Sequence, residues 1–434
     1  MSDRDNDYGT RLLRGGRRIA TALRPSHPSR GENLTLEKNA LSSIFRFLEQ
    51  PLDLYFLIII SFILSSAAFG GYYLLVVVHT PELFFVPNSF NKDLISECKT
   101  LLRPYHPTFW CFNRHLMLVV MLFREFRSKE YKYDSIEQIR MKDGGITGLA
   151  WSGITNIKPK DKTPIVVIFH TIAGDEQDVK NTVGYITNIL KWTAVVCIRR
   201  GHGSLPLAKP QINTMGSTSD LKKQLDYIHK KFPNAPLFGV GISAGSGLLA
   251  RYLGEAGLKS KFAAAVAISP AYDIEKAFHR IHPMYSKIMG QRLIDYFLKR
   301  HYDSLSQLKG FSEVMNTKTM GEFQDRLHHI SGYKSKEEYY QNSNPIHVAA
   351  NIKTPLLILN SEDDPICVYM NVMENLHWLT NLQHSILVKT KRGSHVAYFE
   401  GASARSWSDL VLGEYFQAIL KQKGMMKAKK KISK

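Results

Sequence analysis

Short apolar runs alternate with polar, helix-forming segments over most of the chain. We predict buried strands at residues 164–169, 192–199, 235–240, 262–269, 354–360 and 385–389. The segments between them show helical periodicity, and the alternation continues from Ile165 to Ile419. Strands that alternate with helices form a mostly parallel sheet with helices on both faces. The pattern therefore predicts an α/β fold.

A separate apolar run, Leu54–Val78, contains no charged residue. At about 1.5 Å per helical residue, it is long enough to cross a hydrocarbon layer of about 30 Å. It is too long, and begins too far from the start of the chain, for a cleaved signal peptide. The alternative is a buried core helix, but a position ahead of the other elements leaves it nothing obvious to pack against. We therefore predict one transmembrane helix.

These patterns divide the chain into five regions. We expect a flexible basic tail at 1–50, a transmembrane helix at 51–79, a lead-in segment at 80–130, an α/β domain at 131–420 and a lysine-rich tail at 421–434. The α/β domain begins with a β-hairpin that turns at Gly144-Gly145, and residues 271–352 form an insertion between two predicted strands.

The insertion contains an amphipathic helical pattern whose apolar side holds Ile288, Leu293, Ile294, Phe297 and Leu298. We expect the insertion to form a cap over a pocket, where bulky apolar residues suit an acyl chain. The alternative is that these residues only cover the sheet. A second short apolar run, Leu116–Phe123, fits either the core or a lipid surface.

The candidate chemistry begins with the sequence Gly241-Ile242-Ser243-Ala244-Gly245. A serine on a sharp turn between a strand and a helix needs small neighbours, because strand and helix approach closely there, and the two glycines supply that room. A predicted strand precedes this turn and a helical pattern, Ser246–Leu258, follows it. The alternative is a glycine-rich turn with an idle serine. The flanking elements favour Ser243 as a nucleophile, with Gly241 and Gly245 forming its elbow.

A serine nucleophile needs a histidine to take its proton and a carboxylate to orient that histidine. On an α/β sheet of this type, the acid and then the histidine follow the serine along the chain. The strand at 354–360 runs into an acidic loop, where Asp364 is our candidate acid. The strand at 385–389 runs into a loop that holds His395, our candidate base. The order along the chain predicts a triad of Ser243, Asp364 and His395.

An oxyanion hole needs one backbone N–H from the residue after the nucleophile and another from the loop after an earlier strand. Ala244 supplies the first. The strand at 164–169 opens into His170-Thr171-Ile172-Ala173-Gly174, where we expect Ile172 to supply the second. The alternative second donor is Thr171.

Several further motifs, taken in order, resemble those of a known family. They are Cys98 with Pro107–Cys111, Arg200–Gly203, Gly216–Leu221, Tyr252–Glu255, Ser331–Tyr340, Asp363-Asp364-Pro365, and His395 with Phe399-Glu400-Gly401. Over roughly residues 80–420 the chain resembles the membrane-anchored α/β-hydrolase-domain family of eukaryotes, in the branch of medium-chain phospholipases and relatives of yeast ethanol acyltransferases. The resemblance implies an α/β-hydrolase fold and favours Asp364 over Asp363 as the acid. The chain departs from the family pattern at Ser246 and at Arg114–Leu118, and neither departure removes a catalytic group.

Charge and cysteine content narrow the function further. The chain of 434 residues has a net charge of +19, and its last fourteen residues contribute seven lysines and no acidic residue. A lysine tail suits anionic lipid headgroups or is simply solvated, and no nucleic-acid-binding motif is present, so we expect no nucleic-acid partner. Four cysteines are too few for a disulfide framework, and metal-binding spacings are absent, so we expect neither a metal nor another cofactor.

The arginines ahead of Leu54–Val78 favour a cytosolic N-terminus, as in a single-pass type II protein of an endomembrane such as the endoplasmic reticulum. The lysine tail conflicts with this orientation, because it would prefer cytosolic lipid. The one N-glycosylation sequence, Asn33-Leu34-Thr35, lies ahead of the helix, and Tyr8–Arg30 is alternatively an organelle-targeting signal.

Together these features predict a membrane-bound serine hydrolase that cleaves carboxylic esters of lipids, and the family resemblance implies acyl chains of phospholipids. The bilayer and a lipid ester are its expected partners. If an alcohol resolves the acyl-serine, the protein is instead an acyl-CoA:alcohol O-acyltransferase, and His170 with Asp175 also fits an H-x4-D acyltransferase spacing. A third hypothesis is a non-catalytic membrane scaffold with a hydrolase fold, which the intact triad disfavours.

Overall fold

The computed structural model describes residue 42 and residues 54–432, with the backbone alone at residues 156 and 425–432. The chain forms two units, residues 1–70 and residues 71–434. The tail predicted at 1–50, apart from residue 42, and the glycosylation sequence at 33–35 lie outside the described residues.

Helix α2, Leu54–Tyr72, continues into a π-helical turn, Tyr73–Val77. The 24 residues Leu54–Val77 are mostly apolar and contain no charged side chain. By length and composition, this helix is able to cross a membrane. The sequence also allowed a buried core helix, but no residue of α2 is buried.

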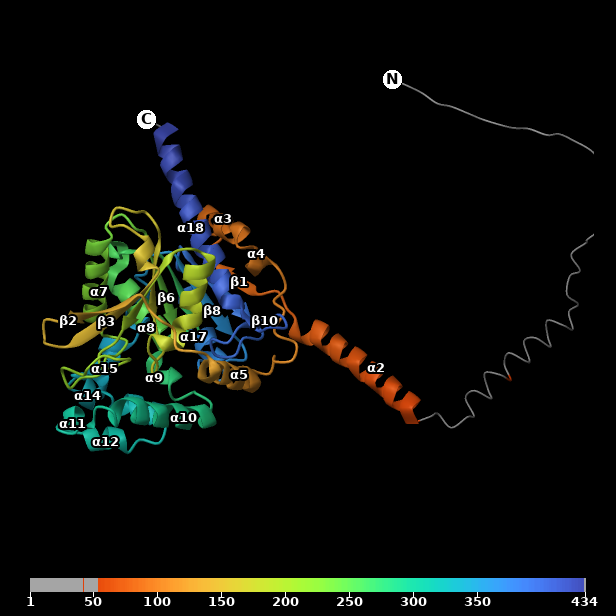
Figure 1. Ribbon diagram of the computed structural model, residues 1–434, viewed down its shortest axis with the longest axis horizontal. Coiled ribbons are helices and arrows are strands. Elements are labelled where there is room, and N and C mark those ends of the chain that lie inside the picture. Colours follow the sequence, from red (N-terminus) through yellow and green to blue (C-terminus); the bar gives the residue numbers. More distant parts are fainter. Residues whose placement is uncertain (1–41, 43–53, 433–434) are drawn as a thin grey trace, which may run out of the picture. The chain divides into compact units, whose positions relative to one another are not determined.

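The second unit is built on a nine-stranded sheet (Figure 1). The strands are β1 (Glu82–Phe85), β2 (Ser135–Arg140), β3 (Ile146–Ser152), β4 (Ile165–Phe169), β5 (Thr193–Ile198), β6 (Leu237–Ile242), β7 (Phe262–Ile268), β8 (Leu356–Ser361) and β9 (Ser385–Thr390). Their order across the sheet is β1-β9-β8-β7-β6-β4-β5-β3-β2. Strands β4 to β9 run parallel to one another, whereas β1, β2 and β3 pair antiparallel at the edges. The predicted α/β fold with a mostly parallel sheet is confirmed.

Helices cover both faces of this sheet. Apolar side chains of α3 (Ser89–Glu97), α4 (Lys99–Leu102), α6 (Lys180–Gly184) and α18 (Trp407–Ile432) share a core with one face. Those of α7 (Thr218–Lys231), α8 (Ala244–Ala256) and α17 (Tyr369–Leu379) share a core with the other. Two short strands, β10 (Phe399–Glu400) and β11 (Arg405–Ser406), form a separate small sheet.

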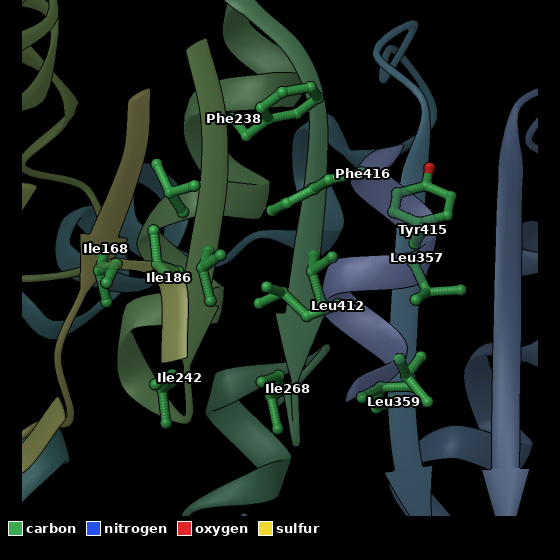
Figure 2. Packing of buried hydrophobic residues seen from close by; sticks show 14 of the residues in the cluster. Ile168, Ile186, Phe238, Ile242, Ile268, Leu357, Leu359, Leu412, Tyr415 and Phe416 are labelled. Carbon is green, nitrogen blue, oxygen red and sulfur yellow. The ribbon is translucent and has the colours of Figure 1, made fainter. Parts of the chain in front are cut away.

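Strand alternation explains why the parallel strands read as continuous apolar runs. In β4, Val166 and Ile168 belong to the core under α18, whereas Val167 belongs to the core under α7 and α8. Successive side chains of a strand point to opposite faces, so a strand covered on both faces must be apolar throughout. Figure 2 shows the first core, where Phe416 of α18 stacks on Phe238 of β6 with ring centroids 4.4 Å apart.

Truncation of Phe416 tests this packing. Phe416→Ala is expected to lower the free energy of unfolding by about 3–5 kcal/mol, because it removes a fully buried ring and leaves a cavity. Denaturant unfolding of the detergent-solubilised chain measures the loss. Phe126→Ala is the matched control, since the ring of Phe126 is 90% exposed. A loss below about 1 kcal/mol for Phe416→Ala would contradict the packing described here.

The lead-in segment predicted at 80–130 contributes an edge strand to the sheet. Strand β1 pairs with β9, from Glu82 opposite Lys389 to Phe85 opposite Ile386. Helices α3 and α4 belong to the same core as α18. The predicted boundary near residue 131 therefore lies within one shared core.

Residues 271–352, the segment predicted to form a cap, consist of short helices, most of which lie below the sheet in Figure 1. The helices are α9 (Ile274–Ala277), α10 (Pro283–Leu293), α11 (Tyr302–Leu305), α12 (Phe311–Met315), α13 (Met320–Arg326), α14 (His328–Ser331), α15 (Lys336–Ser343) and α16 (Ile346–Ala349). Much of the cap packs around a third core, called here the cap core, which also includes Leu207, Ile212 and Met215 from outside the segment.

The amphipathic pattern predicted in the cap is correct for four of its five residues. Leu293, Ile294, Phe297 and Leu298 are buried in the cap core, but Ile288 is 55% exposed. Ile288 and Leu293 lie five positions apart, which is about 140° around a helix, so they cannot share one narrow face.

In the tail predicted at 421–434, α18 continues to Ile432, so the described residues there are helical.

Candidate active site

Ser243 lies on the sharp turn between β6 and α8. Its φ of 54° and ψ of −118° are a strained combination for a residue with a side chain. The turn is held by the Ser243 N–H, which donates to the Ile268 carbonyl of β7 at 2.9 Å. The serine side chain therefore stands at the carboxyl end of the sheet and borders a cavity that residues of the 271–352 segment also line.

Gly241 and Gly245 lie where the turn leaves no room for a side chain. A Cβ on Gly245 would lie 2.1 Å from the Phe169 carbonyl oxygen, and one on Gly241 would lie 2.4 Å from the Ser246 Cα. Both obstacles are backbone atoms, which cannot move aside as a flexible side chain can. The two glycines predicted to form the elbow occupy the positions that this close approach requires.

Gly245→Ala is expected to lower the free energy of unfolding by about 3 kcal/mol, because the added methyl group overlaps the β4 backbone. Thermal unfolding measures the loss. Gly184→Ala is the control, since a Cβ there meets no atom closer than 3.7 Å. Equal unfolding temperatures for the two variants would contradict the close approach of α8 to β4.

The structure brings Ser243, His395 and Asp364 into one chain of hydrogen bonds. The Ser243 Oγ lies 2.8 Å from His395 Nε2, and His395 Nδ1 lies 2.8 Å from Asp364 Oδ2. The other carboxylate oxygen of Asp364 accepts from the backbone N–H groups of Ile366 and Cys367 at 2.7 and 2.8 Å. Both Asp364 and His395 are buried. A carboxylate held at three points orients the imidazole toward the serine.

Asp363, the neighbour of the candidate acid, contacts the backbone of the loop that holds His395. Its Oδ1 accepts from the Ser394 N–H at 2.8 Å, and the Ser394 carbonyl accepts from the Ser361 hydroxyl at 2.6 Å. Burial raises the pKa of Asp363 to about 6. The two adjacent aspartates therefore have different contacts, one with the His395 ring and one with the backbone of its loop.

Ile172 and Ala244, the predicted oxyanion donors, border the same cavity as Ser243. The remaining lining is largely apolar and comes from the cap and the acid loop, through Ala271, Ala277, Phe278, Ile281, Met289, Ile366 and Cys367, together with Met215. An adjoining hollow, which also contacts Ile172 and Ala244, is lined by Leu293, Phe323, Leu327 and Tyr339 among others. The cavity therefore places an apolar wall next to the candidate nucleophile.

Arg199 was not among the residues singled out from the sequence, yet it forms hydrogen bonds with the loop that holds Ile172. Its Nη2 donates to the Ile172 carbonyl at 2.9 Å and also to the Thr171 carbonyl. Burial lowers the pKa of Arg199 to about 10, so the guanidinium stays charged at neutral pH. The Arg200–Gly203 motif lies directly after Arg199, and His202 Nε2 lies 3.4 Å from the Ile172 carbonyl. The Arg200–Gly203 motif was therefore the one sequence feature quoted above that pointed to this position beside the Ile172 loop.

His170 and Asp175, which fit an acyltransferase spacing, have other partners. His170 Nδ1 lies 3.0 Å from the Thr171 carbonyl and 3.2 Å from Arg199 Nη2. Asp175 accepts from the Tyr296 hydroxyl and from the Gln177 N–H. Burial holds the pKa of His170 well below its usual range. The neutral His170 ring is thus a structural part of the loop.

Among the described residues, Asp364, Cys367 and His395 place potential metal-ligand atoms within 4.8 Å of one another. Two of the three already bind each other at 2.8 Å. Burial raises the pKa of Cys367 well above its usual range, which keeps the thiol protonated. The set therefore overlaps the pair that positions the His395 ring.

Comparison with known proteins places these features in a family. Residues 164–402 match the family described as alpha/beta hydrolase fold. Phospholipase ABHD3 of Bos taurus is 26% identical over 82% of this chain and 88% of the relative. Monoacylglycerol lipase of Saccharomyces cerevisiae is 27% identical over 57% of each chain, and human Protein ABHD15 is 31% identical over 52% of this chain and 48% of the relative. Because the family match covers more than half of the chain and includes Ser243, Asp364 and His395, the protein belongs to the α/β hydrolase family.

Proposed function

We propose that the protein is a membrane-anchored serine hydrolase that cleaves carboxylic esters of lipids, with phospholipid acyl chains as the first candidates. The observation that carries this proposal is the hydrogen-bonded chain from Ser243 through His395 to Asp364, which ends at a largely apolar cavity. Relatives named phospholipase and monoacylglycerol lipase support the substrate class.

The geometry supports a two-step acyl transfer. The Ser243 Oγ attacks the ester carbonyl carbon while His395 Nε2 takes the hydroxyl proton, and the Asp364 carboxylate stabilises the resulting imidazolium. The backbone N–H groups of Ala244 and Ile172 are the proposed donors to the carbonyl oxygen as its negative charge develops. The C–O bond then breaks, and His395 passes its proton to the departing alcohol. Water, deprotonated by His395, then attacks the acyl carbon. The bond from that carbon to Ser243 Oγ breaks, His395 returns the proton to Oγ, and the carboxylic acid leaves.

The proposed organisation follows the regions predicted from the sequence. Residues 51–79 anchor the protein, residues 131–420 with the lead-in at 80–130 form the hydrolase, and residues 271–352 cap its pocket. The exposed, uncharged surface of α2 supports anchoring in a bilayer. The arginines ahead of α2 favour a type II orientation in an endomembrane.

Fluorophosphonate labelling of the detergent-solubilised chain tests for an activated serine. The native chain is expected to react with the probe, and Ser243→Ala is expected to lose the label. Absence of labelling in a folded native chain would favour the scaffold hypothesis.

Product analysis separates hydrolysis from acyl transfer. The native chain is incubated with a phospholipid and, in parallel, a monoacylglycerol, each with and without a low concentration of a short alcohol. Free fatty acid is the expected main product under every condition. If the ester of the added alcohol were the main product, the proposed function would change from hydrolase to acyltransferase.

A further inference from the structure

Helix α5, Arg114–Arg127, presents a row of large apolar side chains to its surroundings. The row, called here the α5 stripe, consists of Leu116, Val119, Leu122, Phe123 and Phe126, which are 41% to 90% exposed. Intervals of three and four residues place them on one side of the helix, while Met117 and Leu118 are buried on the other. Contiguous apolar surface of this kind marks an interaction site.

A basic side chain lies beside the stripe. The Arg127 guanidinium lies 4.8 Å from the centre of the Phe123 ring. Arg124, on the other side of the helix, donates to the Ala404 carbonyl and lies over the Phe399 ring. The helix has one acidic residue, Glu125, and burial with the neighbouring Asp178 raises its pKa to about 8. An apolar row with an arginine beside it, on a helix with little negative charge, fits the surface of a bilayer that contains anionic lipid.

The chain passes from the apolar helix into the folded unit without a linker. The π-helical turn ends at Val77, and the Tyr73 hydroxyl already donates to the Pro107 carbonyl at 2.5 Å. The rings of Tyr72 and Tyr73 each lie 6.1 Å from the ring of Phe112, which stands two residues before α5. If α2 spans a bilayer, the segment that begins α5 is therefore held at the point where the chain leaves the lipid.

The first turn of α5 also contacts the candidate active site. The Arg114 carbonyl accepts from the Ser394 hydroxyl at 2.7 Å, and Ser394 directly precedes His395. His115 Nδ1 lies 2.8 Å from the Tyr285 hydroxyl of α10, and Figure 1 shows α5 beside this cap helix. Helix α5 thus joins the histidine loop to the cap.

We propose that the α5 stripe rests on the surface of the bilayer that α2 crosses, so that the contact between α5 and α10 lies next to the lipid from which an ester substrate enters. The inference rests on the proposed membrane-anchored hydrolase. Its occupant is the bilayer because Phe112, two residues before α5, contacts Tyr72 and Tyr73 at the end of the apolar helix, and because Arg127 lies beside the stripe.

Lipid quenching of a site-directed fluorophore tests the contact. Phe126→Cys and Leu258→Cys are each labelled with an environment-sensitive thiol probe and reconstituted, as the full chain, into phosphatidylcholine vesicles with a minor fraction of phosphatidylserine. The four native cysteines are buried, so the introduced thiol reacts first. Leu258 is the matched control, because it is 89% exposed against 90% for Phe126 and belongs to a different surface, after α8. Leu64→Cys in α2 reports whether the helix is in the bilayer.

Brominated lipids are expected to quench the probes at residues 64 and 126 at least about threefold more than the probe at 258. Quenching at 64 alone would overturn the α5 proposal and leave the membrane anchor intact. The absence of quenching at 64 would overturn the anchor and the α5 proposal together. The probe at 126 could instead remain buried in detergent and become exposed on dilution. That result would assign the stripe to a contact with a second copy of the chain and would likewise overturn the proposal.

Activity provides an independent readout. Val119→Glu with Phe126→Glu is expected to lower kcat/KM on a vesicle-embedded ester about tenfold, while turnover of a soluble short-chain ester is unchanged. Leu258→Glu is expected to change neither. An equal loss on both substrates would indicate damage to the site and contradict the proposal. Failure of the native chain to react with a fluorophosphonate would instead refute the proposed hydrolase, whatever the probes at 64 and 126 report.

Discussion

Ser243→Ala is expected to lower kcat for ester hydrolysis by about 10^5- to 10^6-fold, because it removes the atom that forms the acyl-enzyme. The reason lies in the geometry of the elbow. The Ser243 Oγ is the group that lies 2.8 Å from His395 Nε2, at the end of the buried hydrogen-bond chain. Steady-state hydrolysis of a soluble short-chain ester measures the loss without interference from membrane binding.

Ser246→Ala is the matched control for this variant. Ser246 lies three residues further along α8, is fully buried, and its hydroxyl bonds the Ser243 carbonyl. Its removal leaves the nucleophile in place, so a loss of no more than about tenfold is expected. A native-like rate for Ser243→Ala would refute the proposed mechanism.

Asp364→Asn is expected to lower kcat by about 10^3- to 10^4-fold, with little change in fold stability. An amide of the same size still fits the loop, but it cannot stabilise an imidazolium on His395. The hydrogen bond of 2.8 Å between Asp364 Oδ2 and His395 Nδ1 is the contact whose charge is lost. Kinetics on the soluble ester, with circular dichroism to verify folding, measure the effect.

Asp363→Asn tests whether the neighbouring aspartate, which contacts the loop of His395, contributes its charge to catalysis. Asp363 contacts the Ser394 backbone rather than the His395 ring, and an amide oxygen can still accept that hydrogen bond. The expected loss in kcat is about tenfold or less. If Asp363→Asn were the more damaging of the two variants, the acid would have to be reassigned.

The sequence predicted the elements of the fold where local pattern is sufficient. Strands β4 to β9 are buried on both faces, so each appears in the sequence as an apolar run with polar ends. Strand β1 was missed because it is a short edge strand, Glu82–Phe85, in a region that the pattern marked only as a lead-in. Its partner, β9, lies some three hundred residues away, and no local signal records such a pairing.

In the candidate site, the sequence likewise indicated the features that have a local cause. The turn at Ser243 has a local cause, since only small residues fit on either side, and the order of acid and histidine follows from the order of the parallel strands. The role of Arg199 could not be read from its position at the end of β5. Its contacts with Thr171 and Ile172 arise because β4 and β5 are neighbours, so that the loops after them meet.

By itself, the sequence determined the α/β class, the uncharged helix at Leu54–Val77 and the position of the turn at Ser243, because each depends on residues close together in the chain. The tertiary structure decided that Arg199 contacts the Ile172 loop, which residues line the cavity, and that α5 turns an apolar row outward. These features depend on the direction of side chains and on loops brought together from distant segments. Packing sets both, and a linear pattern of polar and apolar residues does not contain them.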